Sequence, residues 1–277
     1  MTSSRPDRAV THALLLLFSF IAVLPIVAIV LTALNGSHTA VGGIELPQPL
    51  SLHALSRAWD TANFSSTLVS SAIIAIGTTI LTVTISVLAG YAFAILRFPG
   101  RNLLFALVLV GLVVPREAMI IPLYYDVNSY ASFLSGTYAI VVLAETGILV
   151  AFGVFWMRAF FAAVPRSLID AATLDGANPF TVLRRVLLKP AWPAVLTLIV
   201  LIFLWSWNEF LLPLVLLAGS PEHQTAPVSL ALFTGRTTRD VPGLAAGSLI
   251  VAAPVLLLYV VFQRQFIRGV MSGAVKG

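Results

Sequence analysis

The sequence predicts an all-α protein that crosses a membrane six times and carries a loop of two short helices between its fourth and fifth spans. Of the 277 residues, 59% are hydrophobic and only 10% are charged, with a mean hydropathy of +0.99. Several apolar runs approach the ~20 residues that a bilayer-spanning helix needs. A single aqueous core could not cover so much apolar surface, so the bilayer is the predicted solvent for most of the chain.

The predicted spans follow the apolar runs in order. The third run is interrupted by Pro115, Arg116 and Glu117, which predicts a helix broken at Pro115 whose charged pair faces protein, water or the headgroups. The six runs are Thr11–Leu34, Leu68–Leu96, Leu103–Leu123, Thr137–Phe161, Ala191–Ala218 and Gly243–Phe262.

The positive charges predict the orientation. With the N-terminus in the cytoplasm, all but four of the 16 Lys and Arg residues fall on the cytoplasmic side, the exceptions being Arg57, Arg116, Arg236 and Arg239. This distribution follows the positive-inside rule, so both termini are expected in the cytoplasm. The first run, preceded by Arg5 and Arg8, also resembles a signal peptide. It is long for such a segment and lacks a convincing cleavage site, so a retained helix is predicted.

Composition also excludes several classes of protein. No linker, low-complexity tract or internal repeat divides the chain, and one membrane domain over residues 1–277 is predicted. The absence of cysteine excludes disulfides, thiolate metal sites and cysteine nucleophiles. The four histidines show no metal-ligand spacing and no serine–histidine pair is evident, so neither a metal nor a catalytic residue is expected. The net charge of +5 is scattered at the ends of apolar runs, which makes membrane lipid, not nucleic acid, the expected partner.

The loop at about residues 162–190 contains its own helix signals. Ser167 and Asp170 have the spacing of a capping box, which predicts the start of a short helix. Gly176 is predicted to end that helix in the left-handed conformation. Asn178 is then the predicted N-cap of a second helix toward Leu187, with proline at its first position.

Two interpretations of this loop follow from its residues alone. A capped connector explains the helix signals. The apolar side chains of Leu168, Leu174 and Phe180, together with the small Ala171 and Ala172, also make a compact knob that fits a cleft in another protein. Its surface is too apolar for a simple solvated loop.

The loop has the spacing of a known signature. Asp170-Ala171-Ala172, Gly176 and Val186 to Lys189 match Glu-Ala-Ala, Gly and Ile-x-Leu-Pro, and so resemble the membrane permeases of binding-protein-dependent ABC importers. Asp170 replaces the usual Glu, and Lys189 stands where Pro is usual, with Pro190 one residue late. Four further patches resemble the maltose-type carbohydrate branch, "YAFAILRFPGR" (91–101), "IPLY" (121–124), "SWNEFLLPL" (206–214) and "GAVKG" (273–277).

The resemblance implies uptake of a sugar, driven by ATP that another protein hydrolyses. Its implied partners are a second permease subunit, two cytoplasmic ATPase subunits and an extracytoplasmic sugar-binding protein, and its implied location is a bacterial inner membrane. The chain has no G-x-x-x-x-G-K-[ST] phosphate loop, so it is not expected to be an enzyme or to hold a cofactor, and the partner subunit would bind ATP. The implied ATPase-coupling residues are Asp170, Ala171, Ala172, Asp175, Gly176 and, in the C-terminal tail, Lys276.

A substrate path is predicted near the end of the fifth run. On a helix, Trp205, Asn208, Glu209 and Leu212 share a face by their spacing. Aromatic, amide and carboxylate groups together suit a sugar, whose hydroxyls need hydrogen bonds and whose C–H faces stack on rings. An equally weighted alternative is that Asn208 and Glu209 join helices to one another.

Glu145 is the other acid within an apolar run. A carboxylate at membrane depth is costly, so it is expected to face the bundle interior or a watery cavity. Because it stands beside Thr146 and Gly147, helix packing is its preferred role.

A self-sufficient ion-coupled secondary transporter or channel, using Glu145 and Glu209, is the alternative function. It leaves the 162–190 loop and the C-terminal tail without a role. A membrane enzyme is a third class, and it lacks a catalytic constellation in this sequence.

Overall fold

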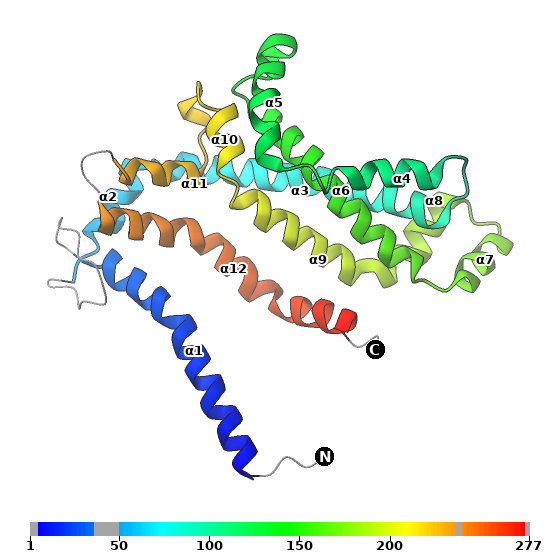
Figure 1. Ribbon diagram of the computed structural model, residues 1–277, viewed down its shortest axis with the longest axis horizontal. Helices are drawn as coiled ribbons and strands as arrows, with labels where there is room; N and C mark the ends of the chain where they lie inside the picture. Colours follow the sequence, from blue (N-terminus) through cyan, green and yellow to red (C-terminus); the bar gives the residue numbers. More distant parts are fainter. Residues whose placement is uncertain (1–4, 36–49, 236–239, 275–277) are drawn as a thin grey trace. The chain divides into compact units, whose positions relative to one another are not determined.

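A computed structural model describes residues 5–35, 50–235 and 240–274 of the chain (Figure 1). Within these ranges the chain is helical and forms no β-strand, which confirms the predicted fold class. The longer helices are α1 (Arg5–Ala33), α2 (His53–Thr61), α3 (Phe64–Ile95), α4 (Arg101–Val110), α5 (Arg116–Tyr130), α6 (Tyr138–Ala162), α7 (Arg166–Leu174), α9 (Leu188–Trp207) and α12 (Val241–Ala274). The shorter elements are η1 (Ser132–Leu134), α8 (Pro179–Thr181), η2 (Val182–Leu187), α10 (Leu211–Leu216), η3 (Pro221–His223), α11 (Ala226–Ser229) and η4 (Leu230–Phe233).

Five helical stretches are long and apolar enough to cross a membrane. They are Val10–Ala33, Phe64–Ile95, Tyr138–Ala162, Pro179–Trp207 and Val241–Gln263. The third predicted span is instead divided between α4 and α5, with Pro115 in the extended conformation at the N-cap of α5, which confirms the predicted break. A ten-residue helix such as α4 is only about 15 Å long. The count of six therefore requires α4 and α5 to cross together, and it stays a prediction.

The predicted bounds of the fifth span are wrong at both ends. Helical structure begins at Pro179 inside the loop and runs through α8, η2 and α9 to Trp207 without interruption. It then breaks before α10, although the apolar run continues to Ala218. The loop's second helix and the fifth span are thus one continuous element.

The chain divides into two compact units, Met1–Ser65 with Ser229–Pro254, and Ser66–Val228 with Val255–Gly277. In the first unit, Arg57 of α2 donates a hydrogen bond to Asp240 at 2.9 Å and forms an ion pair with it. Gly247 of α12 lies so close to η4 that an added Cβ would be 2.8 Å from Leu230. The prediction of a single domain over residues 1–277 is not tested by this division and stays a prediction.

The core of the second unit lies between three long helices. Figure 1 shows α3, α6 and α9 side by side, and their buried side chains form one cluster that includes Val87, Met157 and Leu198. A second cluster joins α3 and α6 to α5 and α10 through side chains such as Ile120 and Leu212. The first cluster packs against the loop that follows α6. The second cluster includes side chains of α10, which begins just after the helix break that follows Trp207.

Two glycines bring α3 and α6 into close contact. A Cβ added at Gly90 would lie 2.6 Å from the Cβ of Met157 and 2.9 Å from the backbone nitrogen of Arg158. A Cβ at Gly153 would lie 2.9 Å from the Cβ of Ser86. Gly147, by contrast, is exposed, and a Cβ there would meet nothing within 4 Å.

Candidate functional site

The loop between α6 and α9 contains the glycine corner that the sequence predicts. Gly176 has a φ of +79°, the left-handed conformation. The N–H of Ala177 donates to the carbonyl of Ala172, and the N–H of Gly176 donates to that of Thr173, both at 3.0 Å. This pair of bonds is a Schellman motif, which ends α7 and turns the chain. The corner prediction is confirmed.

The helix after the corner also begins as predicted. Asn178 Oδ1 accepts a hydrogen bond from the backbone N–H of Thr181 at 2.8 Å, and Pro179 occupies the first helical position. The start predicted for the first helix is wrong. α7 begins at Arg166 after Pro165, whose ψ of 128° is extended, and no side-chain cap bond forms there. Ser167 therefore lies inside the helix and not at its N-cap.

The loop presents different faces to the core and to the outside. Ile169, Ala172 and Ala177 pack against the cluster between α3, α6 and α9. Leu174 is 89% exposed at the end of α7, and Phe180 is also exposed. Exposed apolar side chains that gather on one surface mark a contact with another protein or with the membrane. These exposures are compatible with the knob, and its contact with another protein stays a prediction.

The five loop residues predicted to couple to an ATPase lie together on this knob. Asp170, Ala171, Asp175 and Gly176 are exposed, and Ala172 is half-buried against the core. Among the described residues no ion pair involves either aspartate. Lys276, the remaining predicted coupling residue, lies outside the described residues.

Tyr91 ties this loop to α3. Its hydroxyl donates a hydrogen bond to the carbonyl of Pro179 at 2.9 Å, and its ring packs edge-on against Phe161 of α6. Tyr91 is buried, so this bond holds the first turn after the corner against the membrane bundle. Sequence reasoning missed this contact because its partner is a backbone carbonyl 88 residues away.

A π-helical turn joins the loop to the fifth span. Residues Val182–Leu187 form this wider turn, which ends three residues before Pro190. Proline cannot donate a backbone hydrogen bond, and its ring crowds the carbonyl four residues earlier, here that of Val186. A wider turn at this point accommodates Pro190 without ending the helix. The late proline therefore does not interrupt the entry into the span.

Glu145 joins three helices in the interior of the second unit. Its carboxylate accepts hydrogen bonds from Thr78 of α3, at 3.0 Å, and from Ser206 of α9. The side chain is buried, and all three groups lie in predicted membrane spans. This arrangement is the helix-packing role that was preferred for Glu145.

The fifth span breaks where the substrate path was predicted. α9 ends at Trp207 and α10 begins at Leu211, so Trp205, Asn208, Glu209 and Leu212 do not share one helical face, and that prediction is wrong. Trp205 is partly exposed, with its ring edge-on to Phe152 at 4.9 Å. Leu212 is buried in the cluster with α5, on the other side of the break.

Asn208 and Glu209 occupy the break itself. The amide of Asn208 is exposed and donates to the carbonyl of Leu204 at 2.7 Å. Glu209 Oε1 accepts from the backbone N–H groups of Leu211 at 3.1 Å and Leu212 at 3.4 Å, which satisfies two donors at the start of α10. This polar pair therefore stabilises a break in the helix, which hydropathy alone does not reveal.

Arg116 is the partner of Glu209. The Arg116 guanidinium, on the first residue of α5, donates to Glu209 Oε2 and forms an ion pair with it. Of the three environments left open for the charged residues of the interrupted third span, protein, water or headgroups, the Arg116 guanidinium thus meets protein. The Glu209 side chain is 12% exposed and that of Arg116 is 43% exposed. The pair is partly shielded from water and links the broken third span to the broken fifth span.

We expect Arg116→Met and Glu209→Gln each to lower the free energy of unfolding of the purified protein by about 1–2 kcal/mol, because each change leaves the other charge without its partner. The exposure of Arg116 keeps the cost below that of a fully buried pair. The double variant should lose no more than the worse single variant, because its two changes remove one interaction. Glu117→Gln, on the next residue of α5 and exposed, is the matched control and should change little. Additive losses would contradict the pairing.

Comparisons with known proteins agree with this geometry. Residues 83–270 match the family "Binding-protein-dependent transport system inner membrane component". The trehalose transport system permease protein SugB of Mycobacterium tuberculosis (strain CDC 1551 / Oshkosh) is 32% identical over 258 residues, 92% of this chain and 93% of that protein. The arabinooligosaccharides transport system permease protein AraQ of Halalkalibacterium halodurans is 33% identical over 264 residues, 94% of this chain and 93% of that protein.

A solved structure has the same fold. The match is to a bacterial ABC transporter involved in the import of the acidic polysaccharide alginate, with a TM-score of 0.79 and 23% sequence identity, covering 95% of this chain and 99% of that one. The family match begins inside α3 and ends inside α12, and therefore includes the glycine corner, Glu145 with its partner Ser206, and the broken fifth span. The chain belongs to the family of binding-protein-dependent transport system inner membrane components.

Proposed function

We propose that this chain is the membrane-spanning permease subunit of an ATP-driven importer, which translocates a sugar or oligosaccharide delivered by an extracytoplasmic binding protein. The observation that carries the proposal is the knob at Gly176, an exposed apolar surface built on a fixed corner and continuous with a membrane span. The family membership and the named sugars of the two relatives support it.

The proposed partners are a second permease subunit, two cytoplasmic ATPase subunits and the binding protein. The ATPase subunits bind and hydrolyse ATP, and this chain needs no cofactor of its own. Asp170, Ala171, Ala172, Asp175 and Gly176 contact an ATPase subunit, and the tail with Lys276 reaches between the two. The exposed Leu174 supplies apolar contact area at the same surface.

The proposed mechanism is alternating access. Closure of the ATPase pair moves the knob, and the continuous helix from Pro179 to Trp207 carries that movement to the break at Asn208 and Glu209. Trp205, Asn208 and Glu209 then line the substrate path. Trp205 and Asn208 are the exposed members of this set, as a sugar contact requires.

The test is purification of the tagged chain from its native membrane in mild detergent, followed by reconstitution into vesicles. Co-purification of an ATPase, and sugar uptake that requires ATP and binding protein, are the expected results. Uptake by the chain alone, driven by a proton or sodium gradient and abolished by an ionophore, would replace this proposal with the secondary transporter.

The proposed orientation places the chain in the inner membrane with both termini in the cytoplasm. In this cysteine-free protein, Asn102→Cys is expected to react with a membrane-impermeant maleimide only from the cytoplasm, and Ser51→Cys only from outside. Labelling of intact cells against inverted vesicles measures this directly. Reaction of both cysteines from the same side would contradict the orientation.

A further inference from the structure

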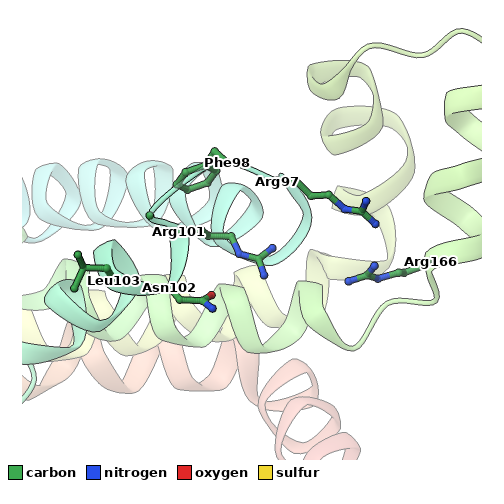
Figure 2. A pocket seen from close by; sticks show the side chains of 7 residues that line it. Arg97, Phe98, Arg101, Asn102, Leu103 and Arg166 are labelled. Carbon is green, nitrogen blue, oxygen red and sulfur yellow. The ribbon is translucent and has the colours of Figure 1, made fainter.

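Three arginines converge on a pocket at the end of the second unit where α3 and α6 finish. The pocket has a volume of about 430 Å³, and Figure 2 shows the Arg166 guanidinium pointing back toward those of Arg97 and Arg101. Arg97 follows α3, Arg101 begins α4 and Arg166 begins α7, so three separate parts of the chain bring their positive charges to one pocket. The remaining lining includes Phe98, Asn102 and Leu103.

No acidic side chain of the described residues forms an ion pair with these arginines. The ion pairs among the described residues are Arg57–Asp240, Arg116–Glu209 and the contact between Glu222 and His223. Asp170 lies one helical turn after Arg166 on α7, yet the two form no ion pair. Like charges gathered without a counter-charge repel one another, so an anion in the pocket would stabilise the arrangement.

The geometry at this pocket suits a phosphate group. Arg101 anchors itself by donating to the carbonyl of Leu96 at 3.2 Å, which leaves further N–H groups of its guanidinium for a ligand. The first turn of α4 adds backbone N–H groups, since no side chain of the described residues caps this helix. Arg158 differs, because its guanidinium stacks on the Phe105 ring at 4.0 Å and does not line the pocket.

An apolar strip leads away from the charged pocket along α4. Leu103 lines the pocket, and Leu107 and Val110 follow it on the same face of the helix, all three exposed. From Leu103 to Val110 the strip is about 11 Å long, roughly a third of the ~30 Å hydrocarbon core of a bilayer. A ligand that fits both features carries a negative charge at one end and a hydrocarbon chain at the other.

We propose that Arg97, Arg101 and Arg166 bind the phosphate of an anionic phospholipid, whose acyl chain lies along the exposed face of α4. Arginine suits this ligand because its planar fork donates two hydrogen bonds to phosphate oxygens. The lipid neutralises the charges that link the ends of three helices, and so holds the start of α7 against the membrane edge. Phosphatidylglycerol satisfies these requirements, and phosphatidylcholine, with no net charge, does not.

The test is a native mass spectrometry titration of the protein, purified with its partner subunits, using phosphatidylglycerol and phosphatidylcholine with identical acyl chains. Phosphatidylglycerol should bind at least about tenfold more tightly. In R97A/R166A this preference should fall to about twofold or less. The variant R184A/R185A removes the same charge from exposed arginines that do not line the pocket, and should keep the preference.

A charge-conserving variant and a competition with inorganic phosphate distinguish phospholipid binding from the alternatives. R97K/R166K retains both charges but loses the planar fork, so an intermediate preference is expected, together with a melting temperature close to the wild type. An unchanged preference in R97A/R166A would overturn the proposal. Displacement of the lipid by inorganic phosphate alone would assign the site to a free anion and overturn it too. Loss of the ATPase subunits from R97A/R166A with the lipid preference intact would assign the arginines to an acidic protein surface instead.

Discussion

Gly176→Val is expected to lower ATP-driven uptake about tenfold while the protein stays in the membrane at normal abundance. Gly176 has a φ of +79°, and a side chain in this left-handed region costs about 1–3 kcal/mol. A cost of 1.4 kcal/mol corresponds to a tenfold change in the population of the native corner. An added Cβ would meet nothing within 4 Å, so backbone strain alone, and not a clash, would produce the loss.

A graded series separates strain from side-chain size at this corner. Asn tolerates the left-handed region better than Ala, and Ala better than Val, so uptake should fall in the order Gly, Asn, Ala, Val at position 176. Gly219→Val is the matched control, since Gly219 also meets nothing within 4 Å and has no positive φ. Equal uptake across the series, at equal abundance, would reduce the 162–190 loop to a connector.

Gly90→Ala is expected to lower the yield and the melting temperature of the purified protein more than any other single-methyl change considered. The new Cβ would lie 2.6 Å from the Cβ of Met157 and 2.9 Å from a backbone nitrogen of α6. A backbone atom cannot rotate away as a side chain can, so α3 and α6 must separate. Overpacking of this kind costs about 1–3 kcal/mol.

Gly147→Ala is the control for Gly90→Ala. It adds the same methyl group to α6 at an exposed position where nothing lies within 4 Å. Ala is favoured over Gly inside a helix, so this variant should melt at the same temperature as the wild type or above it. The comparison is made by size-exclusion chromatography and thermal unfolding in detergent. Equal stability of the two variants would show that Gly90 is not a close-contact position.

Local signals in the sequence predict the loop well. The corner at Gly176 and the cap at Asn178 depend on neighbouring residues alone, and both form as expected. The capping box at Ser167 failed for an equally local reason. Pro165 holds an extended conformation, so the helix begins at the very next residue and Ser167 is already inside it.

Contacts between distant residues could not be predicted in this way. Arg116 and Glu209 are 93 residues apart, and Ser206 and Glu145 are 61 apart. Each of these four residues can be seen in the sequence as a polar residue in an apolar run, but only the packing of the helices decides which of them form pairs. The break after Trp207 was missed because the apolar run continues on both sides of it. The local signals that could have revealed the break are the polar pair Asn208-Glu209 and the proline at position 213.

Under the proposed mechanism, the unbroken helix from Pro179 to Trp207 would act as a lever. Its 29 residues span about 43 Å, so a tilt of about 5° at the loop displaces the far end by roughly 4 Å. That displacement exceeds the length of a hydrogen bond. The Arg116–Glu209 pair lies two residues beyond the end of this helix, so in the proposed mechanism a small rotation at the loop would be enough to separate the two side chains.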